Sequence, residues 1–205
     1  MLGWKRMDVT AIVAVLVGIA PLSYMLTKAA APVIAETPDA PAALVEFTPE
    51  GKLKQPIGYR KWVYVGEVIT PNDMNDGEAS FPEFHSVYMD PESFAEYEKT
   101  GKYRDGTVLV KELSSVGSKE APSGKGYFQG EFTGLEATIK DSKRFKDEPG
   151  YWAYFSFGHK YPLKAEVAKN ATAACNQCHE QNAKKTDWVF SQDYPVLRAA
   201  APHTK

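Results

Sequence analysis

The sequence has few cysteines, only two in 205 residues. A structural zinc site needs about four cysteine or histidine ligands, and the chain has no second cysteine pair to supply them. A charge excess of one sign is also missing, because 24 lysines and arginines balance 26 aspartates and glutamates. With the lysines scattered among the glutamates, the chain offers no basic surface for nucleic acid. Internal repeats are absent too, and the length suits one globular domain with a modest appended segment.

An extended apolar run occurs at the start of the chain. Lys5 and Arg6 precede a nearly uncharged run over residues 9–26, and small residues follow it. The pattern favours a cleaved signal peptide over an uncleaved membrane anchor for residues 1–31, and a buried first helix of the fold is the least favoured alternative. The signal and the anchor both stay open, because the run is slightly long for a signal, slightly short for a membrane span, and interrupted by Pro21.

The charges ahead of the apolar run also predict a location. Positive residues on the leading side keep the N-terminus in the cytoplasm, so the rest of the chain is expected in the periplasm in either case. Only the N-terminus would then contact a membrane. Residues 32–44 are rich in alanine and proline, which is typical of a linker, and a single domain is expected over residues 45–205.

The middle of the chain is typical of antiparallel strands. Short apolar runs are separated there by glycine, proline, asparagine and aspartate. The five predicted strands cover residues 62–70, 84–89, 107–113, 127–139 and 152–157.

Two helices are predicted beside these strands. Asp90 can cap a short helix that has Pro91 in its first turn and ends at Gly101. A second helix, either continuous or broken, is predicted over residues 162–184, which contain good helix formers and no glycine or proline after the start. The fold class expected is therefore α+β, a mainly antiparallel sheet with flanking helices and a C-terminal helix that carries the cysteines.

Both cysteines fall in one motif, Cys175-Asn176-Gln177-Cys178-His179. This spacing lets two thiols add to the vinyl groups of one haem, while His179 lies beneath the iron as an axial ligand. A redox dithiol shares the C-x-x-C spacing, but it usually opens a helix after a strand in a βαβ unit, and no such pattern precedes Cys175. The motif predicts covalent haem c, and export agrees with it, since free cysteine pairs tend to oxidise outside the cytoplasm.

The sixth coordination position of the iron decides between an electron carrier and a ligand-binding haem. Small electron-transfer cytochromes fill it with methionine or a second histidine. No methionine follows His179, and the one later histidine, His203, is almost at the terminus. Met74 lies in a turn-like segment and Met89 ends a predicted strand, so both are expected to be packing or surface residues. A five-coordinate iron with an open position is predicted.

Seven stretches follow one another in a recognisable order along the chain. They are Trp62-Val63-Tyr64-Val65-Gly66, Thr70-Pro71-Asn72-Asp73, Val87-Tyr88-Met89-Asp90-Pro91-Glu92-Ser93, Arg104-Asp105-Gly106-Thr107-Val108-Leu109-Val110-Lys111-Glu112-Leu113, Gly134-Leu135-Glu136-Ala137, the motif from Cys175 to His179, and Tyr194-Pro195-Val196-Leu197-Arg198. In these stretches the chain resembles the cytochrome P-460 family, which includes the cytochromes c′-beta. The resemblance implies a mainly antiparallel β domain with flanking helices, usually a homodimer.

The resemblance implies two alternative activities. Members of the P-460 branch have a lysine bonded to a meso carbon of the haem, and they oxidise hydroxylamine to nitrous oxide or nitrite, passing electrons to an external acceptor such as another cytochrome. Members of the c′-beta branch bind nitric oxide without that bond. The residue that matches the cross-linking lysine is Lys111, so the resemblance predicts a hydroxylamine-oxidising haem enzyme.

The residues around Lys111 leave two orientations open. If Lys111 shares a strand face with Leu109 and Leu113, its amine lies on an apolar surface, where loss of charge makes an amine nucleophilic. If Val108 and Val110 form the inward face instead, Lys111 is an edge lysine in solvent.

Other polar residues near these motifs are weaker candidates. His85 is either a hydrogen-bond and proton-transfer partner for a ligand on the iron or a half-buried packing residue. His159 follows Gly158 in a predicted loop and is expected to face solvent. The family's activity also depends on a carboxylate near the haem, for which Glu131 and Glu166 are candidates, although each is more typical of an exposed charge.

Overall fold

The computed structural model describes residues 44–202. The predicted signal or anchor over residues 1–31, and all but the last residue of the predicted linker over 32–44, lie outside this range. Within residues 44–202, no helix combines the length and the apolar character needed to cross a bilayer.

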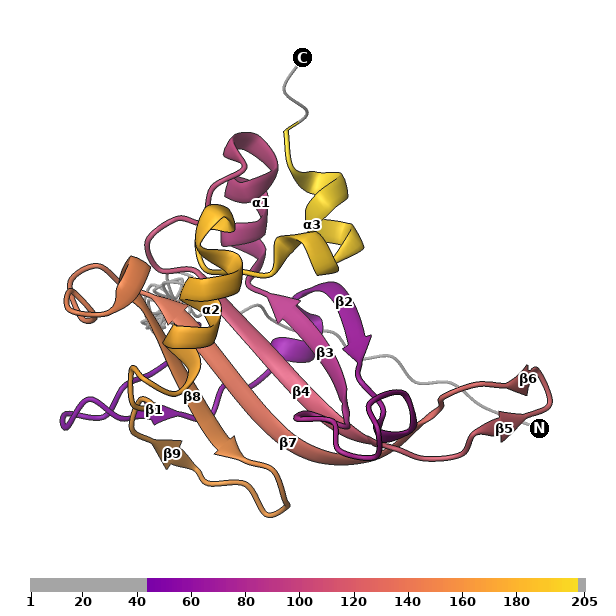
Figure 1. The fold of residues 1–205 in the computed structure, drawn as a ribbon. Helices are drawn as coiled ribbons and strands as arrows, with labels where there is room; N and C mark the ends of the chain where they lie inside the picture. Colours follow the sequence, from indigo (N-terminus) through magenta and orange to yellow (C-terminus); the bar gives the residue numbers. More distant parts are fainter. Residues whose placement is uncertain (1–43, 203–205) are drawn as a thin grey trace, which may run out of the picture. The chain divides into compact units, whose positions relative to one another are not determined.

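The centre of the fold is a five-stranded antiparallel sheet in the order β2-β3-β4-β7-β8 (Figure 1). Within residues 44–202, two small two-stranded sheets and three α-helices accompany it. The predicted α+β class is therefore confirmed. The elements are β1 (Leu53–Lys54), β2 (Val63–Ile69), β3 (Phe84–Met89), α1 (Pro91–Thr100), β4 (Val108–Val116), β5 (Glu120–Ala121), β6 (Gly124–Lys125), β7 (Gln129–Lys140), β8 (Trp152–Gly158), β9 (Glu166–Val167), α2 (Cys175–Ala183) and α3 (Pro195–Ala200).

The central sheet buries apolar side chains on both faces, which explains its nearly continuous apolar strands. On β4, Val110 packs into one core, and Leu109 packs into the other. The first core lies under the β1–β9 pair, where Leu53 and Val167 are buried. The second core lies under the helices and the C-terminal segment. Side chains that alternate along β4 therefore have different environments.

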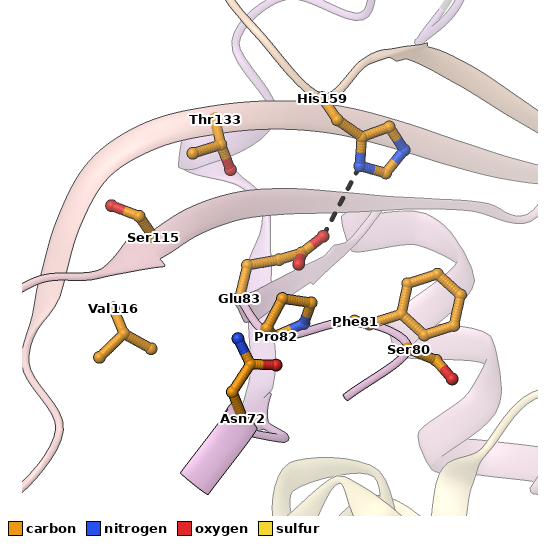
Figure 2. A pocket seen from close by; sticks show the side chains of 9 residues that line it. All are labelled: Asn72, Ser80, Phe81, Pro82, Glu83, Ser115, Val116, Thr133 and His159. Carbon is orange, nitrogen blue, oxygen red and sulfur yellow. Dashed lines mark ion pairs between the residues drawn. The ribbon is translucent and has the colours of Figure 1, made fainter. Parts of the chain in front are cut away.

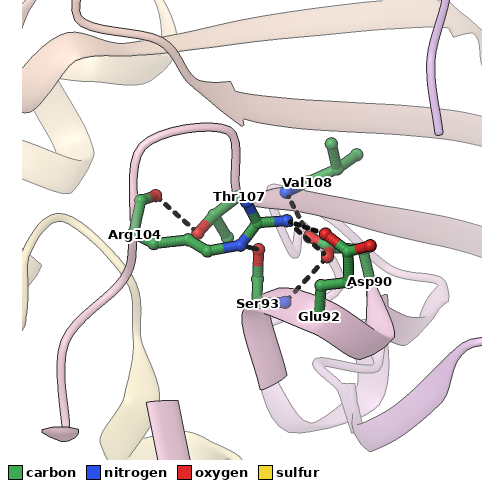
Figure 3. Close-up of polar contacts among 6 residues, drawn as sticks. All are labelled: Asp90, Glu92, Ser93, Arg104, Thr107 and Val108. Atoms are coloured by element: carbon green, nitrogen blue, oxygen red, sulfur yellow. Dashed lines mark hydrogen bonds and ion pairs between the residues drawn. The ribbon is translucent and has the colours of Figure 1, made fainter. Parts of the chain in front are cut away.

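The predicted helix after Asp90 is confirmed as α1 (Figure 3). Asp90 is fully buried, and its Oδ1 accepts a hydrogen bond from the Ser93 amide at 2.8 Å. Its Oδ2 accepts another from the Val108 amide at 2.8 Å, which ties the start of the helix to the start of β4. Gly101 ends the helix in the left-handed region, at φ 68°. The carboxylate of Asp90 therefore caps α1 and also holds the first residue of β4.

The predicted helix over residues 162–184 is wrong for its first half. Only α2 is helical, and β9 lies in the segment before it. In β9, Val167 pairs with Leu53 of β1 and is buried in the first core. The Asn170 amide then donates to the Tyr154 carbonyl at 2.7 Å. These long-range contacts override a local helix propensity, which is a weak preference.

The C-terminal segment packs back onto the sheet through its apolar residues. Leu197 of α3 is fully buried, and α3 lies against β2. The approach is close at Gly66, where β2 has a bulge and φ is 144°. A side chain at Gly66 would meet Tyr194 and Pro195 at 3.1 Å, so glycine is needed for this packing.

Candidate functional site

A cavity of about 430 Å³ lies on the second-core face of the sheet. Strands β3, β4, β7 and β8 line it on one side, and α2 and the segment over 188–197 line it on the other. Its volume is within the range of cofactor pockets, about 300–1,000 Å³. Most of its lining is apolar, and the chemically active residues that line it include Cys175, Cys178, His179, Lys111, His85 and two carboxylates, Glu136 and Asp193.

Helix α2 presents the haem motif to this cavity. Cys178 and His179 lie three and four positions after Cys175, so the three side chains share one side of the helix. Asn176 is 2 % exposed, and its side-chain amide donates to the Trp152 carbonyl at 2.9 Å, which fixes α2 against β8. Both cysteines are free thiols. The motif is therefore held at the cavity by a buried contact outside its ligating residues.

His179 is oriented for a metal bond through Nε2. Its Nδ1 lies 2.7 Å from the Trp188 carbonyl, which can only accept, so Nδ1 carries the hydrogen and Nε2 is the unprotonated nitrogen. The ring packs between Tyr154 and Phe190, with centroid distances of 4.5 and 4.8 Å. Burial lowers the pKa of His179, which favours the neutral imidazole that binds a metal.

Lys111 lies at the cavity and not on the opposite face of β4. Its neighbour Val110 packs into the first core, which decides between the two orientations that the sequence left open. The amine is not in apolar surroundings alone, however. Its Nζ lies 2.6 Å from Oε2 of Glu136, its cross-strand partner on β7, and 5.5 Å from the centre of the Phe81 ring. Lys111 is thus held by a carboxylate inside the cavity wall.

His85 also lines the cavity, from β3. Burial, and next the charge of Lys111, lower the pKa of His85 to about 4, so the imidazole is neutral at physiological pH. Among the described residues, its buried Nε2 has no hydrogen-bond partner, and the same holds for Nε1 of Trp188, which lines the cavity too. Buried polar atoms are seldom left unpaired. These two nitrogens could form hydrogen bonds to a bound molecule that has polar groups at its edge.

Glu136 is the carboxylate that sequence reasoning missed. The candidates Glu131 and Glu166 are both exposed and do not line the cavity, and Glu166 instead pairs with Lys52 at 2.8 Å. Glu136 lies within the quoted stretch Gly134-Leu135-Glu136-Ala137, but only the strand register places it opposite Lys111. A correct prediction that β4 pairs with β7, in the right register, would have placed Glu136 beside Lys111.

The remaining candidates lie elsewhere. Met74 is exposed and Met89 is fully buried in the second core, and neither lines the cavity. His159 is half exposed, as its loop position predicts, yet it contacts Glu136 and Glu83. His203 is outside the described residues.

Comparison with protein families now identifies the chain. The model of the family described as cytochrome P460 matches residues 56–191. The chain belongs to the cytochrome P460 family. No curated protein matches it. The match includes Lys111 and the motif from Cys175 to His179, and it makes this protein a haem-binding cytochrome.

The residues of this cytochrome P460 fit a haem in the cavity. The wall is mainly apolar, as a porphyrin ring requires, and His179 offers an unprotonated Nε2 for iron. The unpaired nitrogens of His85 and Trp188 would gain partners among the polar groups of the cofactor or of a ligand on its iron.

Proposed function

We propose that this cytochrome P460 oxidises hydroxylamine to nitrous oxide or nitrite at a haem bonded to Cys175 and Cys178. In this proposal His179 is the axial ligand, and Lys111 is bonded to the edge of the ring. The observation that carries it is the position of the Lys111 amine, which lies in the wall of the same cavity as the haem motif.

Glu136 supports the proposed bond. A lysine attacks another atom only as the neutral amine, so its ammonium must first lose a proton. The Glu136 carboxylate, 2.6 Å from Nζ, can accept that proton. The ring carbon that takes the nitrogen must also lose its hydrogen and two electrons, so the bond would form only with an external two-electron oxidant such as a peroxide. Once Lys111 is bonded, its remaining N–H can still donate to Glu136. The same pair therefore serves both the formation of the bond and the positioning of the lysine.

The cavity walls support turnover of a small nitrogen substrate. Haem, when bound, supplies the site that takes up electrons from the substrate and passes them on. Neither Met74 nor Met89 reaches the cavity, so neither competes with a substrate for the iron. Neutral His85 can accept a hydrogen bond from the substrate, and the apolar walls limit the entry of water.

Protons must leave this site as well as electrons. Oxidation of hydroxylamine to either product releases at least as many protons as electrons. We propose that Glu136 is the first acceptor, and that an external cytochrome in the periplasm takes the electrons. An export signal is predicted, and the two cysteines of the sequence make one haem motif. Both points support an acceptor that is a separate protein.

A second candidate function is nitric oxide binding without turnover. The ion pair between Lys111 and Glu136 favours it, because a lysine kept as an ammonium is not a nucleophile. In that case Lys111 would tune the charge of the cavity without a bond to the haem.

Hydroxylamine oxidation by a Lys111→Leu variant distinguishes the two candidate functions. The substitution keeps an apolar side chain of moderate size on the same face and should leave haem and nitric oxide binding intact. The proposal requires that Lys111→Leu lose sustained hydroxylamine oxidation with an artificial electron acceptor, while Lys54→Leu on β1, far from the cavity lining, keeps it. If wild-type holoprotein binds nitric oxide but does not oxidise hydroxylamine, the second function replaces the first.

A further inference from the structure

A second hollow adjoins the haem cavity. It has a volume of about 530 Å³, and Phe81 lines both it and the haem cavity. Figure 2 shows His159 and Glu83 directed toward one another across this hollow. The hollow is lined by Asn72, Ser80, Phe81, Pro82, Glu83, Ser115, Val116, Thr133 and His159.

His159 connects the two spaces through both of its ring nitrogens. Its Nε2 lies 3.2 Å from Oε1 of Glu136, whose other oxygen holds Lys111. Its Nδ1 lies 3.6 Å from Oε1 of Glu83 in the second hollow. The first distance is short enough for a hydrogen bond once the ring turns into line, and the second needs a small side-chain rotation or one bridging water. The groups form a continuous series from the haem cavity to the hollow.

This arrangement is poorly explained as a stabilising ion pair. His159 is 50 % exposed, and contacts of exposed charges contribute little to stability. Imidazole, in contrast, can take a proton at one nitrogen and release another from the second, at a pH near neutral. The charged groups that contact His159 are Glu83 and Glu136, and Lys111 contacts the other oxygen of Glu136. Both glutamates are proton acceptors.

We propose that protons released in the haem cavity leave through Glu136, His159 and Glu83. The proton passes from the Glu136 carboxyl group to Nε2 of His159, and the imidazolium then releases its Nδ1 proton to the Glu83 carboxylate and to water in the hollow. Rotation of the exposed ring returns its unprotonated nitrogen toward Glu136. No electron moves in these steps. The relay rests on the proposed function for the source of its protons, but it serves any ligand that loses a proton on binding.

Cyanide binding to the ferric holoprotein tests the relay without turnover. At neutral pH the ligand is hydrogen cyanide, which loses its proton as it binds iron, whereas nitric oxide binds ferrous haem with no proton transfer. In His159→Gln, cyanide association should slow by about tenfold or more, and nitric oxide association should be unchanged.

Glu83→Gln gives a second measurement in which His159 is retained. Its cyanide rate should fall as well, while the matched control Glu131→Gln, an exposed carboxylate outside both spaces, should bind at the wild-type rate. Wild-type cyanide rates in both His159→Gln and Glu83→Gln would overturn the relay, even if the protein oxidises hydroxylamine. Slow cyanide binding in a protein that does not oxidise hydroxylamine would support the relay and reject the proposed function alone.

Discussion

Lys111 and Glu136 face each other across the β4–β7 pair, and the lysine Nζ lies 2.6 Å from Oε2 of the glutamate. This contact places in one wall of the haem cavity the amine that the proposed function bonds to the ring and a base that can take its proton. Glu136 also contacts His159, and this contact links the haem cavity to the second hollow.

Covalent attachment predicts a clear result for the cysteines. Because each thioether bond needs its own sulfur, replacing both Cys175 and Cys178 with alanine should abolish covalent haem. Denatured wild-type protein should retain its haem in acidified organic solvent, and the double variant should release any haem that it binds. Release from the wild type would contradict thioether attachment.

An open sixth position predicts a high-spin ferric spectrum. Met74 is exposed and Met89 lies in the second core, so Met74→Ala and Met89→Leu should leave the spectrum nearly unchanged. Leucine is chosen at position 89 because it nearly conserves side-chain volume in a packed core. His85 is the one other described imidazole that lines the cavity. A low-spin spectrum that becomes high-spin in either methionine variant, or in His85→Phe, would instead indicate an electron carrier.

The lowered pKa of His85 predicts a loss of stability in acid. The unfolded histidine has a pKa near 6.5, whereas burial lowers the folded value to about 4. Between these values the unfolded chain binds a proton that the folded protein does not, so stability falls as the pH falls through this window. The loss should be on the order of 1–3 kcal/mol, because partial exposure reduces it. Denaturant unfolding of the wild type and His85→Phe at several pH values measures this loss. If the free energy of unfolding changes with pH equally in both proteins, His85 does not have a lowered pKa.

Gly150 predicts a coupling between stability and the axial ligand. Its φ is 63°, and a Cβ atom there would overlap the indole ring of Trp188, whose carbonyl fixes His179. Gly150→Ala should lower the free energy of unfolding by about 1–3 kcal/mol and alter the ferric spectrum. Gly124→Ala is the matched control, with φ 121° and no atom within 4 Å of the added carbon. An unchanged spectrum in Gly150→Ala would show that Trp188 does not position His179.

Local signals in the sequence were enough for much of the fold. The cap at Asp90, the proline after it and Gly101 fixed both ends of α1, because each acts on its own helix terminus. Strand β3 was predicted with its observed ends, Phe84 and Met89. The haem motif was equally local, since its two thiols and its imidazole lie within one helical turn and a half.

Features that depend on pairing between distant segments were not predictable. The segment around Val167 has good helix formers, yet it pairs with β1 because that contact buries Val167 in the first core. Glu136 was missed for a related reason. Its importance comes from the register of β7 against β4, and a shift of one residue would place it on the opposite face.

Peptide mapping of the wild-type holoprotein tests the central claim most directly. If Lys111 is bonded to the ring, digestion should yield one haem-bearing fragment that joins the Lys111 peptide to the peptide from Cys175 to His179. The ferrous absorption should also lie at longer wavelength than that of an ordinary haem c, since the bond alters the conjugated ring, and Lys111→Leu should lose this shift. Recovery of Lys111 in a free peptide, together with an unshifted wild-type spectrum, would contradict the cross-link and the enzyme that depends on it.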